Sequence, residues 1–288
     1  MKPANVKPKD FGTIAEQLRR STVQILNGNR GESGSGSGVI WDSGGLIVTN
    51  AHVMRRENAR VELWDGRVFP ATVHSRDDRR DLAALRISTR GLPAAAAGDS
   101  STLRPGELVM AVGNPLGFIG ALTTGVVHAI GPLRGLGRRP WVQAAVRLAP
   151  GNSGGPLADA QGCVVGLNTM VVAGGLALAI PSNSIADFLK RGPGVSLGVT
   201  VRPVNIRSNT TLGLMVLEIA RSSPAETASL LPGDVLIAAN NAAFSNVEDL
   251  SDAIDASAGR LLMLRFMRGG SAAREVAVQL NAPKTAAA

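Results

Sequence analysis

Short apolar runs separated by glycine and polar turns fill the chain from Thr22 to about Ala179. Among these runs are residues 39–40, 46–48, 61–64, 108–112 and 164–167. Asp65-Gly66, between two apolar runs, is a strong signal for a β-hairpin. Many closely spaced strands with no helical periodicity between them favour an antiparallel barrel or sandwich. This part of the chain is therefore predicted to be mainly β.

Helix signals appear only later in the chain. Residues 182–190 are typical of a short helix, and Gly192-Pro193-Gly194 after it makes a natural linker. Ser223-Pro224-Ala225-Glu226 and Ser245-Asn246-Val247-Glu248 both have the pattern of a capping box. The two short helices are expected among strands at 215–219, 235–239, 261–266 and 276–280. A smaller α+β domain is thus predicted after the linker.

Length and composition set further limits. At roughly 150 residues per domain, the 288 residues suggest about two domains. Aromatic residues make up 3% and tyrosine is absent, which leaves little material for stacking nucleic-acid bases. The net charge of +8 lies on the first 193 residues, because the remainder is balanced. Arg79-Arg80 and Arg138-Arg139 are too short for a basic tail and favour solvated loop arginines, as does Arg55-Arg56.

The single cysteine, Cys163, rules out an internal disulfide and is expected to be a small core residue. One cysteine and three dispersed histidines give no metal-ligand spacing. Residues 1–7 lack the apolar stretch of a secretory signal, and no segment approaches 18 uncharged apolar residues. We expect no transmembrane segment, and the sequence alone does not distinguish a cytoplasmic protein from one whose export segment was trimmed.

Gly151-Asn152-Ser153-Gly154-Gly155-Pro156 places a serine on a glycine-flanked turn, where its hydroxyl and several backbone N–H groups can converge. Upstream, His52 follows the small-residue turn Thr49-Asn50-Ala51, and Asp81 directly precedes the apolar run 82–87. The order His, Asp, Ser is one of the known orders of an acyl-transfer triad. We therefore predict Ser153 as nucleophile, His52 as base and Asp81 as the residue that orients it.

Other side chains compete for two of these roles. His74 and His128 are the other candidate bases, but both fall in Val-rich strand patterns without the turn that precedes His52. Asp77 and Asp78 are the other candidate acids, and we interpret them as surface charges.

Together these motifs resemble the HtrA/Deg-type trypsin-like serine proteases with one C-terminal PDZ domain. Four further segments carry the resemblance in the expected order: residues 34–40, 113–117, 179–183, and 223–226 with 231–234. The resemblance implies a chymotrypsin-like double β-barrel, dividing near residues 100–106, followed by a small α+β PDZ domain. The expected boundaries are an extension at 1–20, a protease domain at 21–191, a linker at 192–195, a PDZ domain at 196–282 and a tail at 283–288.

The oxyanion of the tetrahedral intermediate needs donors fixed in advance. The N–H groups of Gly151 and Ser153 are the candidates, and Asn152 contributes to the turn. Members of the family can switch this loop between competent and collapsed states, so the motif indicates a capacity for catalysis.

The segment predicted to form the substrate pocket departs from the family pattern. Ala145 and Arg147 depart from the family pattern, since an aspartate and a small residue are usual there. An inward Arg147 would favour an acidic side chain or occlude the pocket, whereas an outward one would point to solvent or a neighbouring loop. The pocket is expected to consist of Arg147, Leu148, Leu167, Asn168 and Thr169, with Met170 beside them. These residues suggest cleavage after small or medium aliphatic side chains.

The PDZ-like part is expected to bind C-terminal peptides as an added strand. The peptide carboxylate would be received by backbone N–H groups near Ser196, Leu197, Gly198 and Val199. This domain would recruit substrates or regulate the protease.

The resemblance implies an ATP-independent serine endopeptidase of protein quality control and stress response, without a metal or organic cofactor. Its substrates would be unfolded or damaged proteins, its location the periplasm or cell envelope, and its assembly a homotrimer through N-terminal segments. Residues 1–20 contain only Phe11 as an aromatic for such packing. The alternative is a PDZ-guided binding or chaperone protein with a silenced protease site. A third hypothesis, nucleic-acid binding, lacks a recognition motif.

Overall fold

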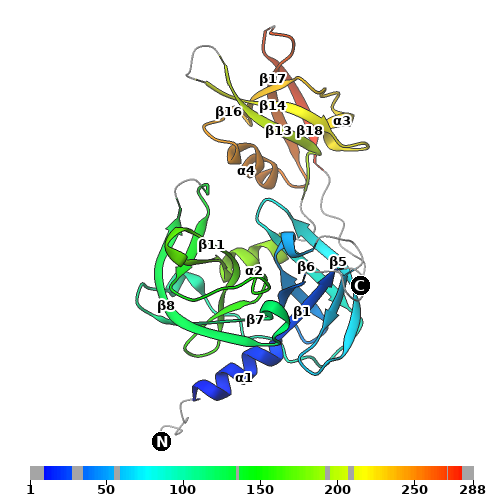
Figure 1. Ribbon diagram of the computed structural model, residues 1–288. Coiled ribbons are helices and arrows are strands. Elements are labelled where there is room, and N and C mark those ends of the chain that lie inside the picture. The colour runs from blue at the N-terminus through cyan, green and yellow to red at the C-terminus, as the bar shows by residue number, and fades with distance from the viewer. Residues whose placement is uncertain are drawn as a thin grey trace, which may run out of the picture. The chain divides into compact units, whose positions relative to one another are not determined.

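The structure is a computed structural model of the chain. It describes residues 10–27, 35–54, 59–133, 136–191, 195–206, 211–270 and 272–280. The chain divides into two compact units, Met1–Lys190 and Arg191–Ala288 (Figure 1). Most of the predicted linker, the predicted tail at 283–288, the Arg55-Arg56 pair and part of the glycine-rich 34–40 motif lie outside the described residues.

Two closed six-stranded barrels make up the first unit, which confirms the predicted fold class. The first barrel has the order β1-β2-β3-β6-β5-β4 and the second has the order β10-β11-β12-β9-β8-β7. The first consists of β1 (Thr22–Asn27), β2 (Ser35–Ile40), β3 (Leu46–Thr49), β4 (Ala59–Glu62), β5 (Val68–Asp77) and β6 (Leu82–Ile87). The second consists of β7 (Leu108–Gly113), β8 (Ala121–Pro132), β9 (Pro140–Ala144), β10 (Pro156–Asp159), β11 (Val164–Val171) and β12 (Ala177–Pro181).

The predicted hairpin at Asp65-Gly66 joins β4 and β5. Gly66 has a φ of +83° and its N–H donates to the Leu63 carbonyl at 3.0 Å. A positive φ favours glycine, so this turn explains why the sequence signal is strong.

Buried aliphatic side chains fill three places in the first unit. One cluster fills the first barrel and another fills the second. The third lies between the barrels, where residues such as Val48 of β3 and Met110 of β7 meet Ile14 and Phe188 from two helices. These helices are α1 (Phe11–Ser21) and α2 (Ser182–Arg191), and α2 confirms the helix predicted at 182–190. The shared cluster holds the two barrels together.

Helix α1 corrects the expectation that helices appear only late in the chain. It occupies the second half of the segment 1–20 predicted as an N-terminal extension and ends one residue beyond it. Asp10 caps it by accepting the Thr13 N–H at 2.8 Å, and Ile14 and Leu18 are its buried apolar side chains. The helix is stable in this place because those two side chains enter the cluster between the barrels.

The second unit contains a sheet of order β13-β14-β15-β17-β18, with β16 paired to β15. Strand β13 therefore lies at an edge of the sheet, and two short helices accompany the strands, as predicted. The elements are β13 (Val199–Ile206), β14 (Thr211–Ile219), α3 (Pro224–Thr227), β15 (Val235–Ala239), β16 (Ala242–Ala243), α4 (Glu248–Ala256), β17 (Leu261–Met267) and β18 (Arg274–Gln279).

The two predicted capping boxes differ in outcome. Ser223 Oγ accepts the Glu226 N–H at 3.2 Å, as expected at the start of α3. The second box lies one residue later than predicted. There the Asn246 side chain accepts the Asp249 N–H at 3.1 Å, and the Asp249 carboxylate accepts the Asn246 N–H at 3.0 Å. A shorter Asn and Asp pair thus does what Ser245 and Glu248 were expected to do.

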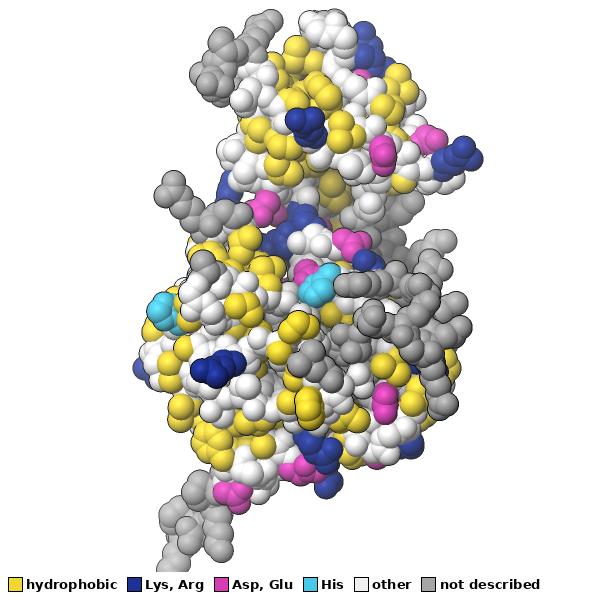
Figure 2. All heavy atoms as spheres, in the orientation of Figure 1, with side chains coloured by type: hydrophobic (Ala, Val, Ile, Leu, Met, Phe, Trp, Pro, Cys, Tyr) yellow, Lys and Arg dark blue, Asp and Glu magenta, His cyan; other side chains and the backbone are white. Residues whose placement is uncertain are grey.

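Basic, acidic and apolar side chains are intermingled on the face of the protein that Figure 2 shows. No helix among the described residues is long and apolar enough to cross a membrane. On the face drawn in Figure 2, basic and acidic side chains are interspersed and form no continuous basic band. Two arginines predicted to be solvated are engaged instead. Arg80 is 20% exposed and pairs with Asp77 at 2.6 Å, and Arg139 donates to the Arg79 carbonyl.

A buried ion pair fixes the Leu231-Pro232-Gly233-Asp234 segment in the second unit. The Asp234 carboxylate is 1% exposed and accepts two hydrogen bonds from Arg268, at 2.7 and 2.8 Å, and one from the Leu231 N–H at 2.8 Å. Burial raises the pKa of Asp234, but the bonds from Arg268 and Leu231 outweigh it and hold the pKa below its ordinary value.

We predict that Asp234→Asn lowers the free energy of unfolding by about 3 kcal/mol near neutral pH, because the charge-assisted hydrogen bonds that Arg268 donates to the buried carboxylate are lost. A carboxylate with a lowered folded pKa contributes stability above its unfolded pKa and loses it as the pH falls through the folded pKa. The difference in free energy of unfolding between wild type and variant should therefore become smaller below about pH 4. Urea unfolding at several pH values measures it.

Glu275→Gln is the matched control for this prediction. Its pair with Arg265 is long, at 3.8 Å, and exposed, so its loss should cost at most about 1 kcal/mol. Equal effects of the two substitutions would contradict a special role for the buried pair.

Candidate active site

His52 lies in a short 3-10 turn, Ala51–Val53, that is separated from β3 only by Asn50. Its Nδ1 is 2.8 Å from Asp81 Oδ2, and its backbone N–H donates to Asp81 Oδ1 at 2.9 Å. The imidazole is 49% exposed and the Asp81 side chain is 22% exposed. The first barrel thus brings together two of the three predicted side chains, with the carboxylate as the more buried of the two.

Asp81 ends the turn between β5 and β6 in a left-handed conformation, with a φ of +55°. Its carbonyl accepts a hydrogen bond from Asn50 Nδ2 at 3.0 Å, which ties this turn to the residues before His52. Asp77 and Asp78, the competing aspartates, pair instead with Arg80 and Arg76 at 2.6 Å each. Only Asp81 of the three is bonded to His52.

Thr169 on β11 is a further partner of this carboxylate. Its Oγ1 donates to Asp81 Oδ2 at 2.8 Å. Burial raises the pKa of Asp81, but hydrogen bonds from the His52 ring, the His52 N–H and Thr169 lower it below its ordinary value. An ionised carboxylate only accepts, so the proton of a neutral His52 must sit on Nδ1, and Nε2 is left with a lone pair.

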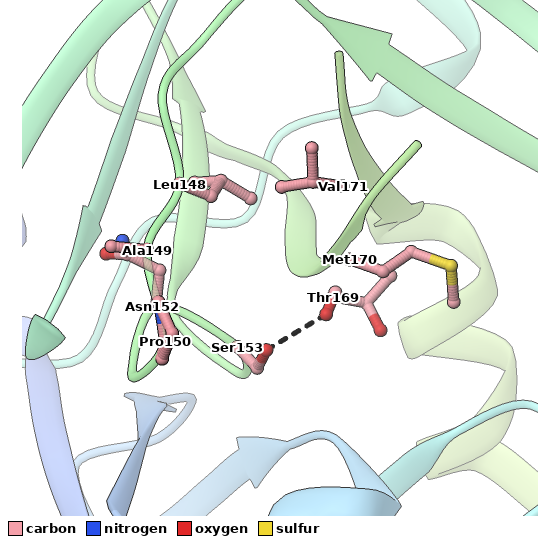
Figure 3. A pocket seen from close by; sticks show the side chains of 8 residues that line it. All are labelled: Leu148, Ala149, Pro150, Asn152, Ser153, Thr169, Met170 and Val171. Carbon is pink, nitrogen blue, oxygen red and sulfur yellow. Dashed lines mark hydrogen bonds between the residues drawn. The ribbon is translucent and has the colours of Figure 1, made fainter. Parts of the chain in front are cut away.

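Ser153 lies on the second barrel in the turn before β10. Its Oγ donates to the Thr169 carbonyl at 2.9 Å (Figure 3). The described residues contain no hydrogen bond between Ser153 and His52. Thr169 therefore contacts both Asp81 and Ser153, a link that the sequence did not reveal because Thr169 was predicted only as a pocket wall.

The turn at residues 149–152 has the hydrogen bond of a β-turn, from the Asn152 N–H to the Ala149 carbonyl at 3.0 Å. Pro150 at its second position and a φ of +106° at Gly151 are typical of a type II turn. The N–H groups of Gly151 and Ser153 donate to none of the described residues. Within the described part of the chain, the two predicted oxyanion donors thus have no acceptor.

A cavity of about 230 Å³ adjoins Ser153. Figure 3 shows Leu148 and Val171 across the cavity from the Ser153 hydroxyl. None of its lining side chains is charged. The lining residues are Leu148, Ala149, Pro150, Asn152, Ser153, Thr169, Met170 and Val171.

This lining agrees with the predicted pocket at Leu148 and Thr169 and differs at three positions. Arg147 is exposed and absent from the lining. Leu167 packs into the cluster between the barrels, and the buried Asn168 donates to the Pro156 carbonyl at 2.8 Å. The pairing of β11 with β12 shifts register between Asn168 and Met170, so regular strand alternation does not hold there.

The predicted peptide-binding segment lies before and at the start of β13. Ser196 Oγ accepts the Gly198 N–H at 3.0 Å, and the buried Leu197 accepts the Ala225 N–H at 3.0 Å through its carbonyl. Gly198 has a φ of +77°, and a Cβ there would lie 2.2 Å from Ser223 Cβ. The segment is thus packed against the start of α3 in a conformation that requires glycine.

Comparison with known proteins agrees with this arrangement. Residues 36–167 match the trypsin-like peptidase domain family, and residues 195–280 match the PDZ domain family. The mitochondrial serine protease HTRA2 of Drosophila pseudoobscura pseudoobscura is 34% identical over 271 aligned residues, covering 82% of this chain and 63% of that protein. The chain belongs to the HtrA family. The HTRA2 protein of Drosophila willistoni is also 34% identical, with 82% and 62% covered.

Solved protease structures share the fold. The serine endoprotease from Yersinia pestis is 25% identical, with a TM-score of 0.67, 96% of this chain covered and 98% of that one. The HtrA-type protease AlgW with a tripeptide is 27% identical, with a TM-score of 0.65 and coverages of 95% and 97%. The chain spans less than two thirds of the length of the HTRA2 relatives. The predicted HtrA-type organisation with one PDZ domain is confirmed.

Proposed function

We propose that this HtrA-type protein is a serine endopeptidase that cleaves unfolded or exposed segments of other proteins. The observation that carries the proposal is the pairing of His52 with Asp81 in a unit where Ser153 borders an apolar cavity. Asp81 supplies the negative charge, and its lowered pKa keeps it ionised at neutral pH.

In the proposed reaction, Ser153 Oγ exchanges its bond to the Thr169 carbonyl for one to His52 Nε2 and attacks the substrate carbonyl carbon. Its proton passes to Nε2, and the oxyanion is held by the Gly151 and Ser153 N–H groups. Collapse breaks the C–N bond, and His52 returns the proton to the leaving amine. Water then attacks the acyl-enzyme with His52 as base, which releases a carboxylic acid and restores Ser153. The cycle consumes water and needs no ATP.

The cavity beside Ser153 indicates the side chain at the cleavage point. Leu148, Met170 and Val171 contribute apolar groups to it, and none of its lining residues carries a charge. A charged substrate side chain would lose its hydration there without a partner, whereas a small or medium aliphatic one would lose nothing. We propose cleavage after such aliphatic residues, with Arg147 outside the pocket.

We propose that the PDZ domain binds C-terminal peptides along β13. In the described sheet β13 pairs only with β14, so its other edge is open for an added strand. The Gly198 conformation next to it favours a tight loop that can present N–H groups to a carboxylate. One related HtrA-type protease, AlgW, was solved with a tripeptide.

A PDZ-guided binding or chaperone protein with a silenced site is the second candidate. The observation in its favour is that the Ser153 hydroxyl bonds to Thr169 instead of His52. A typical hydrogen bond contributes only about 1 kcal/mol net, so exchange of one acceptor for another is a small step. We therefore favour the protease.

The proposed quality-control role fits either compartment that the family suggests. Family resemblance favours the cell envelope, whereas the HTRA2 relatives are named as mitochondrial proteins.

We also propose a homotrimer. Phe11 on α1 is 47% exposed, and Phe118 and Ile119 are 70% and 44% exposed. A Cβ on Gly120 would lie 2.3 Å from Arg19 Cγ, so this apolar loop approaches α1 and could pack with it against another subunit.

The protease proposal predicts that Ser153→Ala abolishes both casein cleavage and labelling by a fluorophosphonate. Asp81→Asn should lower kcat by about 10⁴, because the favoured tautomer of His52 is lost. Asp78→Asn, in the same turn, is the control and should retain activity. A wild type that is neither labelled nor able to cleave casein would favour the alternative, and cleavage that survives Ser153→Ala would contradict Ser153 as the nucleophile.

The PDZ proposal predicts that peptides with a free C-terminal carboxylate bind Ser153→Ala protein and that amidated copies do not. Adding Gly198→Ala should weaken binding about tenfold or more, since the new side chain is strained and clashes with Ser223. Fluorescence anisotropy measures the binding. Gly269→Ala is the control, because its φ is also positive but the space around it is open. Equal binding of amidated peptide would overturn the proposed carboxylate site.

The trimer proposal predicts a light-scattering mass of three chains for the wild type. Phe118→Ser should shift the population toward monomer, because it removes the most exposed apolar side chain of the patch. Val68→Ser changes an exposed valine on the first barrel and should leave the mass unchanged. A wild type that scatters as a monomer at micromolar concentration would refute the assembly.

A further inference from the structure

Ser37 on β2 is a fully buried serine that touches the turn carrying Ser153. Its Oγ donates to the Gly151 carbonyl at 2.7 Å and accepts the Asn114 N–H at 2.9 Å. Its own N–H donates to the Ser153 carbonyl at 2.8 Å. One residue of the first barrel thus holds two carbonyls of the second barrel, one on each side of Asn152.

The hydrogen-bond partners of Ser37 leave only one acceptor for its hydroxyl proton. A hydroxyl has one proton to donate, and Asn114 already donates into the oxygen. Asn114 is itself held by a bond from its Nδ2 to the Val23 carbonyl and by one from the Gly120 N–H to its Oδ1, both at 2.8 Å. Because the Asn114 N–H and, at 3.4 Å, its Nδ2 both donate to the Ser37 oxygen, the Ser37 proton points to the Gly151 carbonyl.

This contact bears on the type II turn at Gly151. The Gly151–Asn152 peptide is planar, and both its ends are bonded: the carbonyl to Ser37 and the N–H to Ala149. The turn is also closely backed, since a Cβ on Gly151 would lie 2.6 Å from the Asn114 carbonyl oxygen. With these groups fixed, the Gly151 and Ser153 N–H groups are the donors left unpaired among the described residues of the turn.

We propose that Ser37 is a positioning residue that holds this turn in the form that presents both N–H groups to the substrate carbonyl. The inference rests on the proposed protease function. It assigns a role to the glycine-rich motif around residues 35–40 and to Asn114, and joins both to the nucleophile turn. Ser37 touches no reacting atom, so its effect on rate is exerted through Gly151 and Ser153.

The test compares Ser37→Ala with Ser182→Ala in the full chain. Ser182 is a matched control because it is equally buried, its Oγ donates to the Gly98 carbonyl at 2.7 Å, and it accepts the Ser100 N–H at 3.1 Å. Ser37→Ala should lower kcat about tenfold to a hundredfold, somewhat less than loss of an oxyanion donor itself, with KM changed less than about threefold. Ser182→Ala should keep both constants near wild type.

A merely structural serine would alter stability and leave the chemistry alone. Affinity for a peptide boronate, which mimics the tetrahedral intermediate, should therefore fall in parallel with kcat in Ser37→Ala. If that variant does not fold, Ser37→Cys keeps the size but donates only weakly, and should show the same pattern. Wild-type kcat and boronate affinity in the folded variant would overturn the proposal.

A crystal structure of the Ser37 variant separates this proposal from the function on which it rests. We expect the Gly151 carbonyl to leave its place in the variant and the φ of Gly151 to leave the positive region. If the wild type shows no Ser153-dependent cleavage, the protease proposal fails. The conformation of the Gly151 turn in the variant crystal still shows whether Ser37 holds that turn. An unchanged turn in the variant would refute that role.

Discussion

Hydrogen bonding between the two barrels is the constraint on which the site depends, since neither barrel carries all of its groups. His52 and Asp81 come from the first barrel and Ser153 from the second. Thr169 crosses the boundary by donating to Asp81, and Ser37 crosses it in the other direction by holding the Ser153 turn. The apolar cluster between the barrels keeps these partners in register, because a small slide of one barrel would break several short bonds together.

Much of the fold could be predicted because the signals are local. Short apolar runs with glycine turns favour an antiparallel barrel or sandwich, and the resemblance to HtrA/Deg proteases implied the double barrel. His52 and Asp81 could be chosen because each borders an apolar run. Helix α1 was missed although Phe11, Ile14, Ala15 and Leu18 recur at the spacing of an amphipathic helix and Asp10 stands at its N-cap. Its stability comes from distant partners in the cluster between the barrels, which no local pattern records.

The pocket was predicted less well, for a different physical reason. Strand alternation predicts which side chains share a face, but the register shift between Asn168 and Met170 breaks the alternation where the cavity begins. Leu167 and Asn168 are both buried although they are adjacent, and Thr169 contacts both Asp81 and Ser153. The sequence contains no signal for a bulge of this kind, because the strand keeps its apolar character on both sides.

Charge placement in the 76–81 segment explains why one aspartate among three serves His52. Arg76 and Arg80 each pair with a neighbouring aspartate, so these charges are balanced within the turn itself. Asp81 is left with donors only from His52 and Thr169, and the left-handed backbone at Asp81 aims its carboxylate at them. Since three such hydrogen bonds stabilise the ionised form, Asp81 keeps the His52 proton on Nδ1. The lone pair on Nε2, which the proposed attack by Ser153 requires, therefore follows from the hydrogen bonds that hold Asp81 ionised beside His52.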